Sequence, residues 1–492
     1  MKKNVKFRNH FFMVVENLLS MWILWIYLLV TIFGEGSFDE KIGSIALFGG
    51  VLLFCFVLNF ITWRKTTYMF DDNAIIIERN SISKKVTTIA MSNIATVNIN
   101  RSFIQGILGI RKVKVDTNST LSTNSEVEIY LKKDDALLFQ KTIMDIIDGN
   151  EDKEMSEIQE NTDMVAQKKN AASVVDILLH CIFTMKIVEI IVVAVAGGFM
   201  IMTETALEEG DSVGGVMGII STFILVGGVV ISFFNSFFAY YKLQAIRNGN
   251  EINISYGFFD KKNFKIPVNK IVSVKIVEPL IGRIFKKAYG EVVCVGMGDE
   301  EKELSLLSLC MNRDELAAKL QEILPECIPD EINEDESLYT YVAEDKKALL
   351  VRILKSIFYS ACIIIGGIIG ISIFNDDVSE IFGAFGVVLL VICAVIFAFG
   401  VLKNKTSGYV IYKDYIKVVD GAFNRTANFI PYKRIEYMTI KKSPVTFLFG
   451  LETANISTKS GNIVDMLTNT CYVNSKDISM IKEQFHQVYK RS

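Results

Sequence analysis

The chain has 492 residues, of which 51% are hydrophobic, and a mean hydropathy of +0.35. This composition is too apolar for an ordinary soluble protein of that length and indicates several membrane spans. The formal net charge of −3 points to no class of partner, and no nucleic-acid binding is predicted.

Six apolar stretches are long enough to cross the roughly 30 Å hydrocarbon core of a bilayer, which takes about 20 helical residues. Their continuous apolar character predicts α-helices, because a helix satisfies its own backbone hydrogen bonds in lipid. The six predicted spans cover residues 12–33, 43–62, 176–202, 213–240, 349–374 and 379–402.

The charges beside the spans predict their orientation. The three short gaps between paired spans, 34–43, 203–212 and 375–380, hold ten acidic residues and one cation, Lys41. Lysine and arginine residues instead gather at the other ends of the spans. The positive-inside rule therefore predicts a multi-pass protein with six spans and with both termini and all large segments in the cytoplasm.

Each pair of spans is followed by a more polar segment, and the three segments align without a gap over 27 residues from Tyr68, Ala245 and Tyr409. This recurrence of one sequence pattern predicts a repeated structural unit. The expected parts are transmembrane hairpins at 1–62, 173–242 and 346–402, domains at 63–147, 243–324 and 403–492, and acidic linkers at 148–172 and 325–345.

Alternating apolar residues and polar turns predict a small antiparallel β meander in each domain, with Gly257 and Gly421 supplying positive φ in a turn. A six-residue motif, which we call the hexad, follows that turn and begins and ends with isoleucine. In two repeats a proline follows its first isoleucine, where it replaces a backbone donor as a strand begins. The hexad residues are Ile89 and Ile94, Ile266, Pro267 and Ile271, and Ile430, Pro431 and Ile435.

A glycine turn and an alternating strand are expected after each hexad. Gly109 and Gly450 lie twenty residues after the first hexad isoleucine, and Gly290 is assigned the same role with a displacement of four residues. Before Gly450, the side chains of Phe447 and Phe449 either close the open end of the small barrel or contact lipid or a partner. Their fixed place in the repeat favours core closure.

An amphipathic helix is predicted at the end of each domain. Asp135, Asp314 and Asp477 open these stretches, 46 to 48 residues after the first hexad isoleucine. An acidic residue in the first turn suits the positive end of the helix dipole.

This order of elements resembles the bacterial pleckstrin-homology-like (PH-like) family of YdbS/YdbT proteins, and the three-fold arrangement is similar to its longer members. Arg8-Asn9-His10-Phe11 keeps all but the proline of the Arg-x-His-Pro that usually begins the family's hairpin. The resemblance implies a bacterial plasma-membrane protein built from three repeats. Each repeat would contain a transmembrane α-helical hairpin and a PH-like β-barrel, or strongly bent antiparallel sheet, with a C-terminal helix. The resemblance does not imply that the domains bind a phosphoinositide.

The sequence contains no recognisable catalytic, nucleotide-binding or zinc motif. Its three histidines, His10, His180 and His486, lie in separate repeats, which leaves little material for histidine-based catalysis. We therefore expect no enzymatic activity, no cofactor and no metal.

Two interpretations apply to the charged residues Lys186 and Glu189 within the third predicted span. Buried intramembrane charges often mark a transport path. Alternatively, the span begins near Ile187 and these groups lie at the inner headgroups. The second interpretation is favoured, because Glu16 and Lys355 occupy nearly the same depth in the other repeats.

Basic residues cluster near the glycine turns and are candidates for facing the membrane or a partner. The alternative is a solvated strand edge that lysines protect against pairing. The candidates are Arg111, Lys112, Arg283, Lys286, Lys287, Lys433, Arg434, Lys441 and Lys442.

The leading functional hypothesis is a non-enzymatic scaffold or accessory factor of the cell envelope whose cytoplasmic domains bind proteins, peptides or the membrane surface. Expected partners are membrane lipids and a protein, for example a smaller single-repeat relative, and the chain could form an oligomer. The alternatives are a transporter or channel subunit and an envelope-stress sensor. Transport is disfavoured because no proline interrupts any span.

Overall fold

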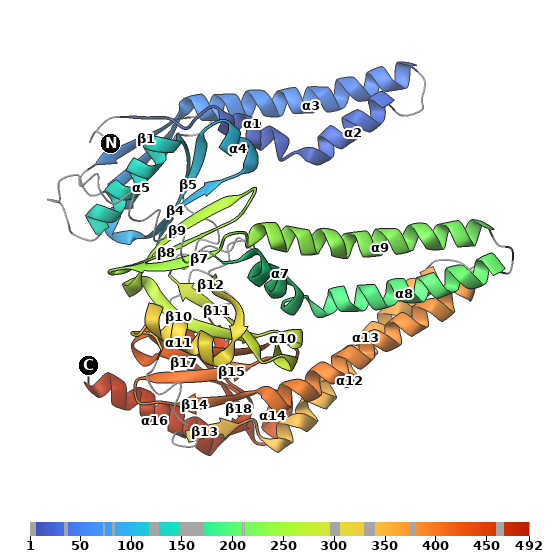
Figure 1. Ribbon diagram of the computed structural model, residues 1–492, viewed down its shortest axis with the longest axis vertical. Helices are drawn as coiled ribbons and strands as arrows, with labels where there is room; N and C mark the ends of the chain where they lie inside the picture. The colour runs from blue at the N-terminus through green and yellow to red at the C-terminus, as the bar shows by residue number, and fades with distance from the viewer. Residues whose placement is uncertain are drawn as a thin grey trace. The chain divides into compact units, whose positions relative to one another are not determined.

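In the computed structural model, drawn in Figure 1, the chain folds into two compact units. The first comprises Met1–Asp163 and Phe259–Lys265, and the second comprises Met164–Phe258 and Ile266–Ser492. The residues that the structure describes are 6–33, 38–71, 74–80, 84–117, 127–147, 172–208, 210, 212–295, 306–328, 340–373, 379–458 and 467–491.

The first predicted span, 12–33, is two helices rather than one. Helix α1 (Phe12–Leu19) and helix α2 (Trp22–Phe33) meet with a bend of 65°. Phe12 of α1 is buried against Tyr130 of the domain, whereas α2 exposes large apolar side chains along its length. Because α1 packs on the domain, the chain bends between α1 and α2, and no proline is needed for this bend. Helix α3 (Phe38–Lys65) completes the hairpin.

The strands of the first domain are divided between two sheets, so the predicted barrel is wrong for the residues described. Strands β1 to β3 form one sheet, and β4 to β6 lie in another. Helix α5 packs on the second sheet and buries Phe139 and Ile143 between them. The elements are β1 (Thr66–Asp71), β2 (Ala74–Asn80), β3 (Lys84–Ala90), β4 (Ile94–Arg101), β5 (Ile110–Thr117), β6 (Val127–Lys132) and α5 (Lys133–Ile147).

The second unit contains two helical hairpins, and the predicted span 176–202 is wrong at its start. The helix that covers its first residues, α7, ends at Phe183, and the apolar helix α8 begins at Ile187. Helices α8 and α9 pack side by side, as do α12 and α13 (Figure 1). Their bounds are α7 (Val174–Phe183), α8 (Ile187–Glu208), α9 (Ser212–Ala239), α12 (Lys346–Ile373) and α13 (Ser379–Thr406).

Four helices are long and apolar enough to cross a membrane in the described part of the chain, and the bent pair α1 and α2 gives a fifth if it forms one span. Six spans therefore remain a prediction. The four helical segments are Lys41–Lys65, Ile187–Thr205, Gly214–Ala239 and Lys346–Gly366.

The second and third domains share one seven-stranded sheet, with strand order β12-β11-β10-β16-β15-β14-β13. Strands β7 and β8 form an antiparallel pair. Strands β17, β18 and β19 form the other sheet of the third domain, where β20 also pairs with β18. The strands are β7 (Gln244–Asn248), β8 (Glu251–Tyr256), β9 (Lys261–Pro267), β10 (Ile271–Glu278), β11 (Lys287–Cys294), β12 (Leu306–Asn312), β13 (Thr340–Ala343), β14 (Gly408–Ile411), β15 (Tyr415–Asp420), β16 (Arg425–Pro431), β17 (Ile435–Lys441), β18 (Leu451–Thr458), β19 (Leu467–Asn469) and β20 (Val473–Asn474).

A strand before the third hairpin belongs to the domain that follows the hairpin. Strand β13 lies inside the predicted linker 325–345 and pairs with β14 from Thr340 opposite Ile411 to Ala343 opposite Gly408. The chain thus enters and leaves the hairpin through neighbouring strands. Phe7 and Tyr68 form the equivalent bridge in the first repeat. The predicted linker 148–172 lies outside the described residues except at its last position.

All six hexad isoleucines are buried, with at most 5% of each side chain exposed. Each hexad is a strand end, a 3-10 turn and a new strand. The prolines end strands rather than begin them, because Pro267 and Pro431 are the last residues of β9 and β16. The turns are η1 (Met91–Asn93), η2 (Val268–Lys270) and η5 (Tyr432–Arg434).

The predicted C-terminal helix is confirmed in each domain. Asp135, Asp314 and Asp477 lie in the first turns of α5, α11 (Arg313–Ile323) and α16 (Ser475–Arg491). The predicted positive φ is also confirmed at Gly257 (107°) and Gly421 (120°).

Candidate functional site at the hairpin–domain junctions

A short helix with exposed apolar residues occupies the same place in every domain, and we call it the apolar tip. The tips are α4 (Phe103–Ile107), α10 (Leu280–Ile284) and α14 (Pro444–Leu448), each with its C-cap residue. The exposed fractions are large: Phe103 55%, Ile104 47%, Ile107 72%, Leu108 55%, Ile284 74%, Phe285 59%, Phe447 69% and Leu448 80%.

The predicted core closure is wrong for Phe447, which is exposed together with the neighbouring Leu448. Only Phe449 faces inward, where it packs partly buried against Val351 of α12 and Leu451 of β18. A tight turn of α14, capped by the Ser443 hydroxyl, separates the outward pair from the inward residue.

A residue with left-handed backbone ends each tip. Gly109 (φ 68°) and Gly450 (φ 66°) do so as predicted, but the second repeat uses Lys286 (φ 53°). Lys286 lies twenty residues after Ile266, so the repeats need no displacement. The assignment of Gly290 is therefore wrong. Gly290 lies within β11, where a Cβ atom would approach Leu320 of α11 to 2.8 Å, so it serves close packing instead.

Each tip lies beside the foot of its own hairpin, meaning the residues where the helices meet the domain. Phe285 packs against Phe183 of α7, with ring centroids 5.6 Å apart. In the first repeat, Gln105 Nε2 of α4 donates to Glu16 of α1 at 2.7 Å. In the third, α14 packs against α12. The tips are thus held where the helices depart.

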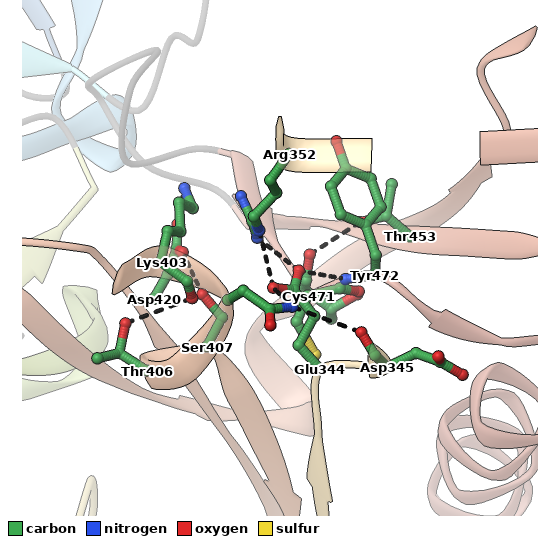
Figure 2. A network of polar contacts seen from close by, with 12 residues as sticks. Glu344, Asp345, Arg352, Lys403, Thr406, Ser407, Asp420, Thr453, Cys471 and Tyr472 are labelled. Atoms are coloured by element: carbon green, nitrogen blue, oxygen red, sulfur yellow. Dashed lines mark hydrogen bonds and ion pairs between the residues drawn. The ribbon is translucent and has the colours of Figure 1, made fainter. Parts of the chain in front are cut away.

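A buried ion pair fixes the third foot (Figure 2). The Glu344 side chain is fully buried and accepts from Arg352 Nε of α12 at 2.8 Å. It also accepts from Asn404 Nδ2 of α13 at 2.9 Å and from the backbone N–H of Tyr472 at 3.0 Å. One carboxylate therefore ties both helices of the hairpin to the domain.

Further contacts surround this carboxylate. The Tyr472 ring lies 5.2 Å from the Arg352 guanidinium and 5.1 Å from the Lys355 ammonium, which also donates to the Tyr472 hydroxyl. At the base of α13, Lys403 pairs with Asp420 at 2.8 Å. The Lys403–Asp420 pair holds the end of β15 against the hairpin (Figure 2).

The first foot uses an amide in place of the ion pair. Asn9, in the motif Arg8-Asn9-His10-Phe11, accepts from the backbone N–H of Tyr130 and donates to the Tyr68 hydroxyl, both at 3.1 Å. The backbone carbonyl of Asn9 accepts from Trp63 Nε1 at 2.8 Å. The motif therefore fastens the chain between α3 and the domain.

The second foot is fastened by a buried imidazole in α7, which precedes the candidate span at Ile187. His180 Nδ1 accepts from the backbone N–H of Cys310 in β12 at 3.1 Å. Its ring lies edge-on to Tyr240 and Tyr289, at centroid distances of 4.7 and 5.3 Å. Burial lowers the pKa of His180 to about 4, so the ring is neutral near pH 7.

The ionisable residues near Ile187 are used locally. Glu189 accepts from the Lys186 backbone N–H at 3.1 Å, which caps α8, and from Ser232 of α9 at 2.7 Å. This arrangement agrees with the interpretation that α8 begins near Ile187.

The predicted basic candidates do not form one surface. Lys112 pairs with Glu128 at 2.7 Å, Arg111 donates to the Ile110 carbonyl, and Arg283 donates to the Ala422 carbonyl. Lys287 is half-buried at the start of β11.

The remaining candidates lie at two places. Lys433 and Arg434 belong to η5, at the other end of β17 from the tip, and seven strand residues span about 20 Å. Lys286, Lys441 and Lys442 lie at the tips, where Lys442 pairs with Glu452 at 2.7 Å.

Sequence reasoning missed Glu344, Arg352 and Tyr472. Glu344 lies in a predicted acidic linker and Arg352 in a predicted apolar span. The composition of these two segments did not suggest that the two side chains form a buried pair. The available signal was position, because Glu344 precedes its hairpin as Asn9 precedes the first. In the described residues, no group of three or more His, Cys, Asp or Glu side chains could hold a metal ion.

The fold and these junctions define a membrane protein with apolar helical hairpins and repeated PH-like domains. The protein-family model described as bacterial PH domain matches residues 22–146, 190–320 and 359–487, which is more than half of the chain, so the chain belongs to this family. It is 24% identical over 455 residues to the UPF0699 transmembrane protein YdbT of Bacillus subtilis (strain 168), covering 87% of this chain and 86% of that protein. No solved structure matches it significantly.

Proposed function

We propose that the protein is a non-enzymatic scaffold or accessory factor of the bacterial plasma membrane. Its PH-like domains sit on the cytoplasmic membrane surface through their apolar tips and offer their remaining surface to protein partners. The observation that carries this proposal is the exposure of large apolar side chains at all three tips, beside the hairpin feet.

The exposed apolar side chains of the tips are more stable in lipid than in water. Removing one large apolar side chain from water contributes roughly 1.5–3 kcal/mol. Each tip carries two to four such side chains, and short amphipathic elements bury their apolar face about 5–10 Å into the headgroup boundary. Exposed Lys286 and Lys441 would meet anionic headgroups, with about 1 kcal/mol for each charge.

The junctions support the same arrangement, because they set the position of a tip relative to its hairpin. The Glu344 pair and the β13–β14 pairing hold the third domain to α12 and α13 at several points. Such a tip needs little reorganisation to meet the bilayer from which its helices emerge. Three weak surface contacts on one chain also reinforce one another through effective concentration.

The bend between α1 and α2 removes one argument against transport, because a span can be interrupted without proline. The acidic groups near this bend and near the start of α8, however, accept hydrogen bonds from neighbouring side chains. Glu16 accepts from Gln105 and Tyr130, and Glu189 accepts from Ser232. These contacts favour anchoring of the domains over an ion pathway. Six spans with cytoplasmic termini form part of the proposal.

Photo-crosslinking of the full chain in nanodiscs tests the proposal. A benzophenone amino acid at position 448 should give covalent lipid adducts, detected by mass spectrometry. The control position is 414, exposed in the β14–β15 turn at the far end of β15 from the foot. Lipid adducts at 448 but not at 414 are expected, and equal yields at both positions would contradict the proposal.

A further inference from the structure

Two strands from successive repeats pair in a defined register. In the second unit, β10 pairs with β16 from Val274 opposite Phe429 to Glu278 opposite Arg425. Ile276, five residues after the last hexad isoleucine of its repeat, lies opposite Ala427, three residues before the first hexad isoleucine of the next. The strand that follows one hexad thus joins the strand that leads into another.

The first unit contains the same join. Ile99 of β4, five residues after Ile94, lies opposite Asn263 of β9, three residues before Ile266. Arg101 lies opposite Lys261, as Glu278 lies opposite Arg425 in the other join. Because two independent pairs of strands use one register, the join is a property of the repeat.

Two strand edges of the kind that these joins use have no partner strand among the described residues. Strand β17 follows the last hexad and is the outer strand of its sheet, and β3 leads into the first hexad and is the outer strand of its own. In the described residues no strand pairs with either outer edge. Tyr437 is 49% exposed, Ile440 39% and Val86 52%. Exposed apolar edges of this kind recruit further strands.

We infer that β17 of one copy of the chain pairs with β3 of a second copy in this register. The register places Ile440 opposite Val86, Thr439 opposite Thr87 and Met438 opposite Thr88. A β-branched apolar pair and a threonine pair are favourable cross-strand neighbours. Strands β10 and β16 belong to two repeats of one chain, whose hairpins enter the same membrane. A join in the same register between two copies of the chain is therefore compatible with both copies lying in one membrane.

The charges at the end of this join set its strength. Lys441 faces Lys85, and Lys442 faces Lys84. Lys442 is compensated by Glu452 at 2.7 Å, so the main repulsion is between Lys441 and Lys85. Salt screens such a pair, and association therefore strengthens as ionic strength rises. The contact joins two different surfaces, so further copies would add head to tail.

Disulfide trapping in liposomes tests the contact with two tagged versions of the full chain. One version carries Ile440→Cys and the other Val86→Cys, and mild oxidation should give a dimer containing both tags. The matched control replaces Val86→Cys with Lys141→Cys, which is exposed on α5. Equal dimer yields with both partners would overturn the inference.

Charge variants provide an independent measurement that does not involve the apolar tips. Lys85→Glu turns the repulsive pair into an attractive one and should tighten self-association about two- to fivefold in equilibrium sedimentation. Val86→Lys should abolish it. A chain that stays monomeric in all variants and at all salt concentrations overturns the inference while leaving the proposed membrane contact intact. Loss of lipid adducts at position 448 with self-association retained would contradict the proposed membrane contact and leave the inferred strand pairing intact.

Discussion

Lys286 holds a backbone conformation that its side chain disfavours. Its φ of 53° matches those of Gly109 and Gly450 at the same place in the other repeats. The left-handed region costs a non-glycine residue about 1 kcal/mol or more. The second repeat therefore carries local strain at the end of its tip.

Lys286→Gly should stabilise the segment from α10 to β11 by about 1 kcal/mol, because it removes this strain. Hydrogen exchange of the segment in the full chain measures the effect, and slower exchange is expected. The control is Lys287→Gly at the start of β11, which should speed exchange because glycine weakens a strand. Faster exchange in Lys286→Gly would contradict the assignment.

His180 should make the contact between α7 and the second domain sensitive to pH. Burial lowers its pKa from 6.5 to about 4, so the docked ring stays neutral while the released ring binds a proton below pH 6.5. Stability at this contact is complete above pH 6.5. It falls as the pH drops from 6.5 to 4, by up to about 1.4 kcal/mol for each pH unit.

Hydrogen exchange of α7 between pH 7.5 and 5, corrected for the intrinsic pH dependence of exchange, measures this loss. His180→Phe keeps an apolar ring without the titration and should remove the pH dependence, although it loses the hydrogen bond from Cys310. An unchanged pH profile in that variant would contradict the role of His180.

At the scale of elements, the third foot depends on a buried ion pair. Arg352→Met leaves the Glu344 carboxylate buried without its cation and should destabilise the third domain by about 3–5 kcal/mol. The double variant with Glu344→Gln should recover most of that loss, because no buried charge remains. Limited proteolysis of the third domain in both variants and in Glu344→Gln measures the coupling. Additive losses would show that the two side chains act independently.

The elements also show what a single sequence can and cannot predict. Period-two strands, buried hexad isoleucines and the final amphipathic helices follow from local patterns, and the structure has them. The breaks after α1 and α7 do not, because they arise where one helix face packs on a domain distant in sequence. The assignment of Gly290 failed because it matched the residue type of the other repeats and not their spacing. At the matching position Lys286 holds the left-handed conformation.

At the scale of the whole molecule, membrane character and family follow from composition and repetition. The apolar tips were found as a motif but assigned to the core, because an apolar run has the same composition whether it faces a core or lipid. Only the exposed fractions of Phe447 and Leu448 separate these cases. The Glu344 network was missed because its members lie 8 to 128 residues apart in the chain.

Electron paramagnetic resonance measures whether the apolar tips enter the bilayer. Spin labels at positions 107, 285 and 448 of the full chain in liposomes, with Cys55, Cys362 and Cys393 of the hairpins replaced, report access to oxygen or to an aqueous relaxant. All three tip positions are expected to favour oxygen, as lipid-facing sites do, while position 414 should favour the aqueous relaxant. Water-exposed labels at all three tips would contradict the proposed membrane contact.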